Sequence, residues 1–312
     1  MNKLRHFLFT HWPLKPVIAL SKHLRLPGFD GLPLYDVTDF FIQRLQEGEL
    51  QTRARSMAFS FLLALFPAVI FIFTLIPYIP IDNFQYQLLG LIQALLPSNT
   101  YEAIRTTIED IVNHQRGGLL SFGFFFALFV SADGILALMN WFNRSFHGKA
   151  QRSGWQMRLM AIGLTITLAF FVLLAIGLIV TSEVVYQYLV KEDVINNTVN
   201  IVMLQAGKWL ILLSLCFSAI SLLYYFGPSK HEKLRFISAG SSLATLLIVI
   251  TTLGFNFFVT NFGTYNKVYG SIGTLIIILI WLYINSLVLL VGYELNVSIK
   301  KTQRKITPLP TN

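Results

Sequence analysis

Six separate stretches of this 312-residue chain are each long and apolar enough to cross a lipid bilayer as an α-helix. Crossing the hydrocarbon layer takes about 20 mostly apolar residues, and only a helix or a closed barrel satisfies its own backbone hydrogen bonds there. Only 12% of the residues are charged, against about 25% in soluble domains. The sequence therefore predicts an all-α, polytopic membrane protein with transmembrane helices at 57–79, 119–139, 159–181, 207–227, 237–259 and 273–293.

The lysine and arginine residues are divided unequally between the two sides of this predicted membrane domain. The N-terminal segment, the second and fourth connections and the C-terminal tail hold 19 of the 24, and the remaining positions hold 5. Cytoplasmic loops carry the excess of basic residues, so both termini are predicted to be cytoplasmic. This distribution accounts for the net charge of +9 without a nucleic-acid site, and we expect no nucleic-acid partner.

The spans divide the chain into three parts. Residues 1–56 form a cytoplasmic N-terminal segment, and residues 57–293 form the six-helix transmembrane domain. That domain includes a predicted periplasmic helical hairpin at 81–118, and residues 294–312 form a cytoplasmic C-terminal tail.

The N-terminal segment contains a predicted amphipathic helix at 36–50, for which Thr38 or Asp39 is a candidate N-cap. Its apolar side chains lie roughly on one face, at Val37, Phe40, Phe41 and Leu45. We expect this helix to lie on the cytoplasmic membrane surface, with binding of a partner protein as the alternative.

Asp133 lies inside the second span, where a carboxylate costs about 2.5–3.5 kcal/mol on insertion scales. Such a group usually faces the bundle interior and has a partner. Asn140 and Arg144 follow on the same helical face. One interpretation is a polar path to the cytoplasm that serves a substrate or a proton. The other is a buried carboxylate hydrogen-bonded to a serine or threonine of a neighbouring helix.

Polar residues also follow single faces of the third to sixth spans. Helices in lipid associate through small and polar residues, so these stripes indicate either helix packing or a shared polar cavity. If a cavity exists, its candidate lining or substrate path consists of Asp133, Asn140, Arg144, Asn256, Asn285 and Asn296. Glu294 ends the sixth span on the face opposite Asn285, near an interface where a charge costs little, and we expect it to lie outside this path.

Two further features concern backbone shape. Pro67 interrupts the first span and removes one helical hydrogen bond, which predicts a kink that serves packing or opens space for a ligand. The connection before the sixth span is rich in glycine and polar side chains. It is a candidate gate, or simply a tight outer turn, formed by Tyr265, Asn266, Lys267, Tyr269 and Gly270.

The last third of the chain resembles the YihY/BrkB family of bacterial inner-membrane proteins. The resemblance rests on YYFGP at 224–228, AG at 239–240, AT at 244–245, NFGTYNKVYGSIG at 261–273, WLY at 281–283 and GYELN at 292–296. Upstream, Arg55, Ala58, Pro67, Asn140 and Arg144 match as well, so that it covers roughly 40–298. The chain departs from the family pattern at Val130 and at 238–240. The resemblance implies six spans and a location in the bacterial inner membrane.

Some proteins of this family carry a ribonuclease label. Metal-dependent nucleases need clustered metal ligands, and the six histidines here are scattered. We identify no catalytic residues, metal site or cofactor, and expect that the protein is not an enzyme. A GxxxxGK[ST] phosphate loop is also missing from the sequence, so this chain does not hydrolyse ATP through one.

Two functions remain. The first is a transporter or flippase-like protein for a lipid or another amphipathic substrate. The second is a non-transporting membrane scaffold or assembly factor. Membrane lipid is the expected partner, and a membrane-protein partner is an open alternative.

Overall fold

The computed structural model describes residues 24–25, 28–46, 49–75, 117–145, 152–191, 198–229, 235–261 and 271–306. Over these residues the chain forms helices and no strand, which confirms the all-α prediction. The helices are α3 (Leu34–Gln46), α4 (Glu49–Leu75), α7 (Gly117–Ser145), α8 (Gly154–Lys191), α9 (Thr198–Phe226), α10 (Ala239–Asn261) and α12 (Ser271–Ile306). The predicted hairpin at 81–118 lies outside the described residues, except that α7 begins at its last two positions.

The six long helices match the six predicted spans in number and order. Five of them are long and apolar enough to cross a membrane within the described part of the chain. The remaining long helix, α4, corresponds to the first predicted span, 57–79, and the described part of this helix ends at Leu75. The first and last of the six extend beyond their predicted spans at the polar ends, since α4 begins at Glu49 and α12 continues to Ile306.

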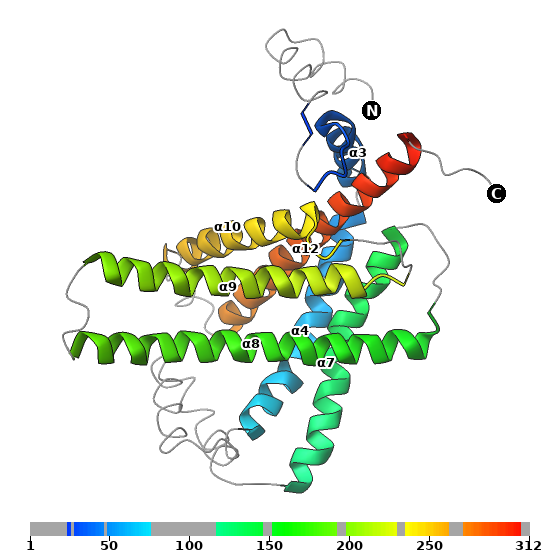
Figure 1. Cartoon of the computed structure of the whole chain (residues 1–312). Helices are drawn as coiled ribbons and strands as arrows, with labels where there is room; N and C mark the ends of the chain where they lie inside the picture. Colours follow the sequence, from blue (N-terminus) through cyan, green and yellow to red (C-terminus); the bar gives the residue numbers. More distant parts are fainter. Residues whose placement is uncertain are drawn as a thin grey trace.

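Each long helix packs against the next one along the chain, and α12 also packs against α4, so the six form a closed ring of neighbours. Helices α8, α9 and α10 run side by side and cross the α4–α7 pair (Figure 1). The main core lies where α4, α7, α9 and α12 meet. Its largest fully buried side chains include Met57, Leu138, Phe142 and Tyr293.

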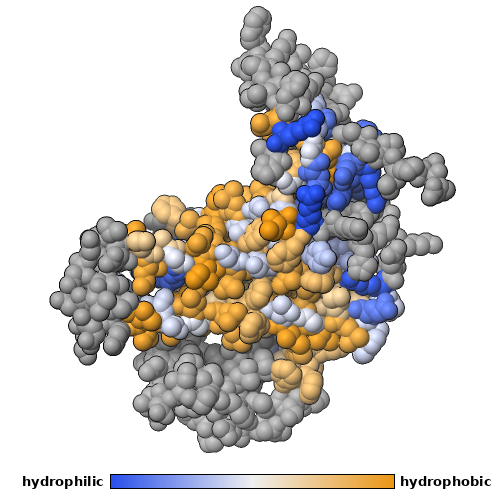
Figure 2. Space-filling model, in the orientation of Figure 1, coloured by the Kyte–Doolittle hydropathy of each residue, from blue (hydrophilic) through white to orange (hydrophobic). Residues whose placement is uncertain are grey.

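The outer surface of α8, α9 and α10 is apolar. Large side chains such as Phe170, Trp209 and Phe257 are more than half exposed, and Figure 2 shows hydrophobic residues over this face. Soluble monomers rarely expose apolar patches of more than a few hundred Å². This surface therefore fits contact with lipid, as the apolar composition of the spans predicts.

Glycines allow α10 and α12 to cross at close range. A Cβ atom on Gly292 would lie 2.7 Å from the Cβ of Ala244 and from the carbonyl oxygen of Gly240. Real Cβ atoms essentially never approach so closely, so this crossing requires glycine at 292. Asn296, one turn further along α12, fixes the crossing because its Oδ1 accepts a hydrogen bond from the Gly240 amide at 2.8 Å.

Helix α3 packs against α12, and we refer to this part of the molecule as the α3 end (Figure 1). Val37 is fully buried there in a small cluster with Phe29, Leu32, Leu295 and Ile299. The apolar face of the N-terminal helix is therefore covered by α12, whereas the sequence analysis assigned it to the membrane surface.

The start of α3 also differs from the prediction. The helix begins at Leu34, directly after Pro33, because proline suits the start of a helix. Neither Thr38 nor Asp39 is an N-cap, since both lie inside the helix, and Leu50 belongs to α4.

Candidate functional site

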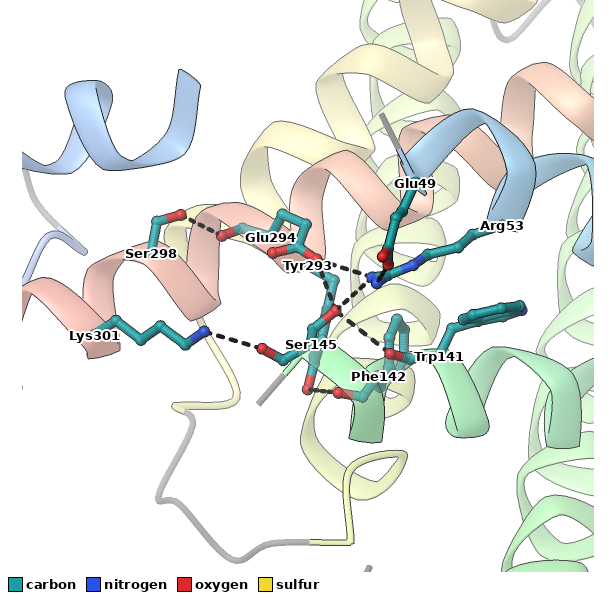
Figure 3. Close-up of polar contacts among 9 residues, drawn as sticks. All are labelled: Glu49, Arg53, Trp141, Phe142, Ser145, Tyr293, Glu294, Ser298 and Lys301. Carbon is teal, nitrogen blue, oxygen red and sulfur yellow. Dashed lines mark hydrogen bonds and ion pairs between the residues drawn. The ribbon is translucent and has the colours of Figure 1, made fainter. Parts of the chain in front are cut away.

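A buried ion pair and a serine that bridges it connect three helices near the α3 end. Arg53 of α4 and Glu294 of α12 lie 3.6 Å apart, with side chains that are only 10% and 3% exposed. Ser145, the last residue of α7, accepts a hydrogen bond from Arg53 at 3.2 Å and donates one to Glu294 at 2.6 Å (Figure 3). Arg53 also pairs with the exposed Glu49 one turn earlier on α4. We call Arg53, Ser145 and Glu294 the buried clasp.

The surroundings of the buried clasp are aromatic. Phe142 stacks on Tyr293 with ring centroids 3.8 Å apart, and Tyr224 meets both rings edge-on at 5.6 Å. The Tyr224 hydroxyl donates to the carbonyl of Leu289 at 2.6 Å. Buried charges are costly unless they are paired and hydrogen-bonded. The buried clasp is therefore stable only where α4, α7 and α12 are packed together.

The buried clasp was not predicted from the sequence, where Glu294 was expected to lie near a membrane interface at which a charge costs little. In the structure every residue from 293 to 299 is buried, although the predicted cytoplasmic tail begins at 294. A usable signal was present. Glu294 is the only charged residue between 273 and 299, and a single charge within such a long apolar helix indicates a residue with a specific partner.

Asp133 forms another ion pair between helices, with Arg158 in the first turns of α8. The Arg158 guanidinium also donates to the carbonyl of Phe129 at 3.0 Å and lies 3.6 Å above the Phe129 ring centroid. The partner of Asp133 is therefore an arginine, whereas the sequence analysis considered a serine or threonine. The Arg158 side chain is 12% exposed and the Asp133 side chain 52%, so the carboxylate is the open member of the pair.

Asp133, Asn140 and Arg144 are all exposed on α7, and we call these three residues the α7 strip. They share one helical face, as predicted, and the exposed Phe126 and Phe129 continue that face toward the start of the helix. The Arg144 guanidinium lies 4.5 Å above the Trp141 ring centroid. One exposed face of α7 therefore changes from apolar to polar along the helix.

The other predicted path residues have three different surroundings. Asn256 is exposed on α10, and partly buried Asn285 donates to the carbonyl of Trp281 in its own helix at 2.8 Å. Asn296 is buried. Its side-chain amide accepts a hydrogen bond from the Gly240 amide at 2.8 Å and donates one to the Ser238 hydroxyl at 2.9 Å. The described contacts of Asn296 are those of a packing residue that holds the start of α10 against α12. A shared cavity through these residues stays a prediction.

Pro67 lies within α4, which continues as a helix to Leu75. The Ser131 hydroxyl of α7 donates to the carbonyl of Ala64, in the turn before this proline, at 3.3 Å. The predicted outer turn at 265–270 lies outside the described residues.

In the described part of the chain, no group of three or more His, Cys, Asp and Glu residues is arranged to hold a metal ion. Just before α8, Arg152 donates to the carbonyl of Phe226 at the end of α9 at 2.9 Å. Partial burial lowers the pKa of the Arg152 guanidinium.

These features together define a multi-pass integral membrane protein with an apolar outer surface. The chain belongs to the virulence factor BrkB family, whose model matches residues 41–311, and this confirms the resemblance seen in the sequence. No solved structure matches the chain.

Relatives in the family cover most of the chain. It is 31% identical over 260 residues to the putative ribonuclease-like protein YfkH of Bacillus subtilis, which covers 83% of this chain and 93% of that protein. It is 25% identical to a UPF0761 membrane protein of Vibrio campbellii, over 83% of this chain and 81% of that protein. The label "ribonuclease-like" describes the Bacillus protein, and these names assign no catalytic activity to the present chain.

Proposed function

We propose that this protein moves a lipid, or another amphipathic molecule with a polar head group, between the two leaflets of the membrane along α7. The observation that carries the proposal is the carboxylate of Asp133 on α7, whose side chain is 52% exposed although it lies within a transmembrane helix. Charged residues in transmembrane segments usually face the protein interior, because hydrocarbon solvates them poorly. An open carboxylate on an outer face offers a polar head group a place to leave water while its chains stay in lipid.

The other residues of the α7 strip also support movement of a head group along α7. Asn140 and Arg144 extend the polar face from Asp133 to the end of α7, and Phe126 and Phe129 continue it as an apolar face on the other side. Asp133 lies twelve residues before the end of α7, which corresponds to about 18 Å along a helix axis. The part of α7 that is long and apolar enough to cross a membrane is Phe124–Ser145, and the strip occupies its second half.

The proposal includes a location in the bacterial inner membrane, cytoplasmic termini and a role that is not enzymatic. The distribution of basic residues supports this orientation. Reporter fusions after Asn312 and in the 192–197 connection are expected to give cytoplasmic and periplasmic signals, respectively. A periplasmic signal at Asn312 would overturn the orientation.

The function is tested with the purified protein in lipid vesicles that contain a phospholipid labelled with a fluorophore on its acyl chain. A membrane-impermeant reductant bleaches only the outer leaflet, so lipid movement appears as bleaching of the protected inner pool. We expect movement with the wild-type protein, a strong reduction with Asp133→Asn, and wild-type movement with the control Asp36→Asn. Asp36 is an exposed carboxylate on α3, away from the α7 strip.

The alternative is a non-transporting scaffold or assembly factor that acts with a membrane-protein partner. If the folded wild-type protein moves neither a lipid probe nor another amphipathic probe, the transport proposal is wrong and this alternative is left. Equal movement by wild type and Asp133→Asn would instead remove α7 as the path.

A further inference from the structure

We infer that the α7 strip recognises a zwitterionic phospholipid whose head group carries a primary ammonium. This inference rests on the proposed function, because it names the class of substrate that the same strip accepts. The strip carries a negative charge at Asp133, an amide at Asn140 and a positive charge at Arg144, in that order along one exposed face. The ammonium of such a head group is complementary to Asp133 and its phosphate to Arg144, and a head group that moves along the strip meets the two residues one after the other.

Asp133 offers the anionic end because its partner leaves most of the carboxylate uncovered. The guanidinium of Arg158 is held in place by the Phe129 carbonyl and by the Phe129 ring, and its side chain is only 12% exposed. The pair therefore presents its negative end outward. An ionised carboxylate has about four acceptor positions, so Asp133 accepts hydrogen bonds from a ligand ammonium without losing Arg158.

Arg144 offers the cationic end. Its guanidinium stacks on Trp141, one turn nearer to Asp133, because helical side chains lean toward the helix N-terminus. Asp133 and Arg144 are eleven residues apart, about 16 Å along a helix axis, and Asn140 lies between them. Arginine binds phosphate through charge-assisted hydrogen bonds. A moving head group therefore meets a phosphate-binding residue and an ammonium-binding residue on one track.

The same arrangement disfavours two other classes of head group. An anionic head group without an amine brings only negative charge to Asp133, and like charges in this setting repel. A quaternary ammonium keeps its charge but has no N–H group to donate. We therefore expect the order ethanolamine, then choline, then glycerol.

The experiment uses three probes with the same labelled acyl chain and either an ethanolamine, a choline or a glycerol head group. The label is on the chain so that the ammonium stays free. With wild-type protein we expect the ethanolamine probe to move about tenfold faster than the glycerol probe, the size of one hydrogen bond to a charged group. Arg144→Gln is expected to slow all three probes by a similar factor, because all three carry a phosphate.

The decisive variant exchanges the two charges, Asp133→Arg with Arg158→Asp. It keeps an ion pair between α7 and α8 but presents the positive end outward, and we expect the glycerol probe to become the faster one. If the exchanged protein does not fold, Asp133→Asn replaces it in the test, because this substitution preserves side-chain shape. We expect Asp133→Asn to abolish most of the ethanolamine advantage. Equal movement of all probes by wild type would overturn the inference and leave the proposed function standing.

A second readout decides the inference if no probe moves and the proposed function fails. The protein is equilibrated with vesicles of equal ethanolamine and glycerol phospholipid and extracted mildly, and its bound lipid is measured by mass spectrometry. An excess of ethanolamine lipid that falls in Asp133→Asn would support the site. Equal amounts on wild type and variant would refute it.

Discussion

In the part of the chain that the structure describes, two arginine–carboxylate pairs connect helices, and they differ in what surrounds the carboxylate. In the buried clasp, Glu294 is 3% exposed and has both Arg53 and Ser145 as partners. In the second pair, Asp133 is 52% exposed beside Arg158. The enclosed carboxylate is committed to holding three helices together, whereas the open carboxylate keeps acceptor positions for a ligand. Exposure, more than residue type, separates a structural pair from a candidate binding pair.

The largest expected effect comes from breaking the buried clasp. Glu294→Gln leaves Arg53 without a buried counter-charge, and loss of one member of a buried pair costs about 3–5 kcal/mol. We expect the free energy of unfolding in mild detergent to fall by that amount. The matched control is Glu49→Gln, because Glu49 contacts the same arginine but is 69% exposed, and its expected cost is below about 1 kcal/mol. Equal costs for the two variants would contradict the distinction drawn from exposure.

Ser145→Ala tests the bridge within the buried clasp. The hydroxyl contacts both charged groups, and a hydrogen bond to a charged group contributes about 1.5–3 kcal/mol. The ion pair itself remains, so the loss of stability is expected to be smaller than for Glu294→Gln. A denaturant titration of both single variants and the double variant measures their coupling. Strict additivity would show that Ser145 does not act through this pair.

Lys301→Met tests how the buried clasp is closed at the end of α7. The Lys301 ammonium donates to the backbone carbonyl of Ser145 at 3.2 Å, where the helix dipole is negative. A cation at this position contributes about 0.3–1 kcal/mol, so we expect a small loss of thermal stability. A loss as large as that of Glu294→Gln would mean that Lys301 is part of the ion pair.

A smaller effect on stability is expected at the open pair. In Asp133→Asn the amide oxygen of the new side chain still accepts from Arg158, whose guanidinium keeps its contacts with the carbonyl and the ring of Phe129, so the loss of stability is expected to be smaller than for Glu294→Gln. Lipid movement, in contrast, is expected to fall strongly. Thermal unfolding and the vesicle assay on the same preparation check the separation. A large loss of stability together with a loss of movement would make Asp133 a structural residue like Glu294.

The candidate site was only partly predictable. Asp133, Asn140 and Arg144 share a face of α7 because their spacing repeats the helical turn, which the sequence contains. The arginine that pairs with Asp133 was not predictable, because Arg158 comes from another helix. The apolar spacing of α3 predicted a face turned to the membrane surface or to a partner protein, and only the structure shows that α12 covers this face.

Hydropathy along the chain was enough to predict an all-helical membrane protein and the order of its spans, which the described helices follow. Hydropathy and helix length are properties of single segments, so no neighbour is needed to read them. The packing of the helices, in contrast, is what brings Glu294 to Arg53 in a closed core and leaves Asp133 exposed beside Arg158. Each meeting depends on the rotation and register of two helices, and one residue of register turns a side chain by about 100°.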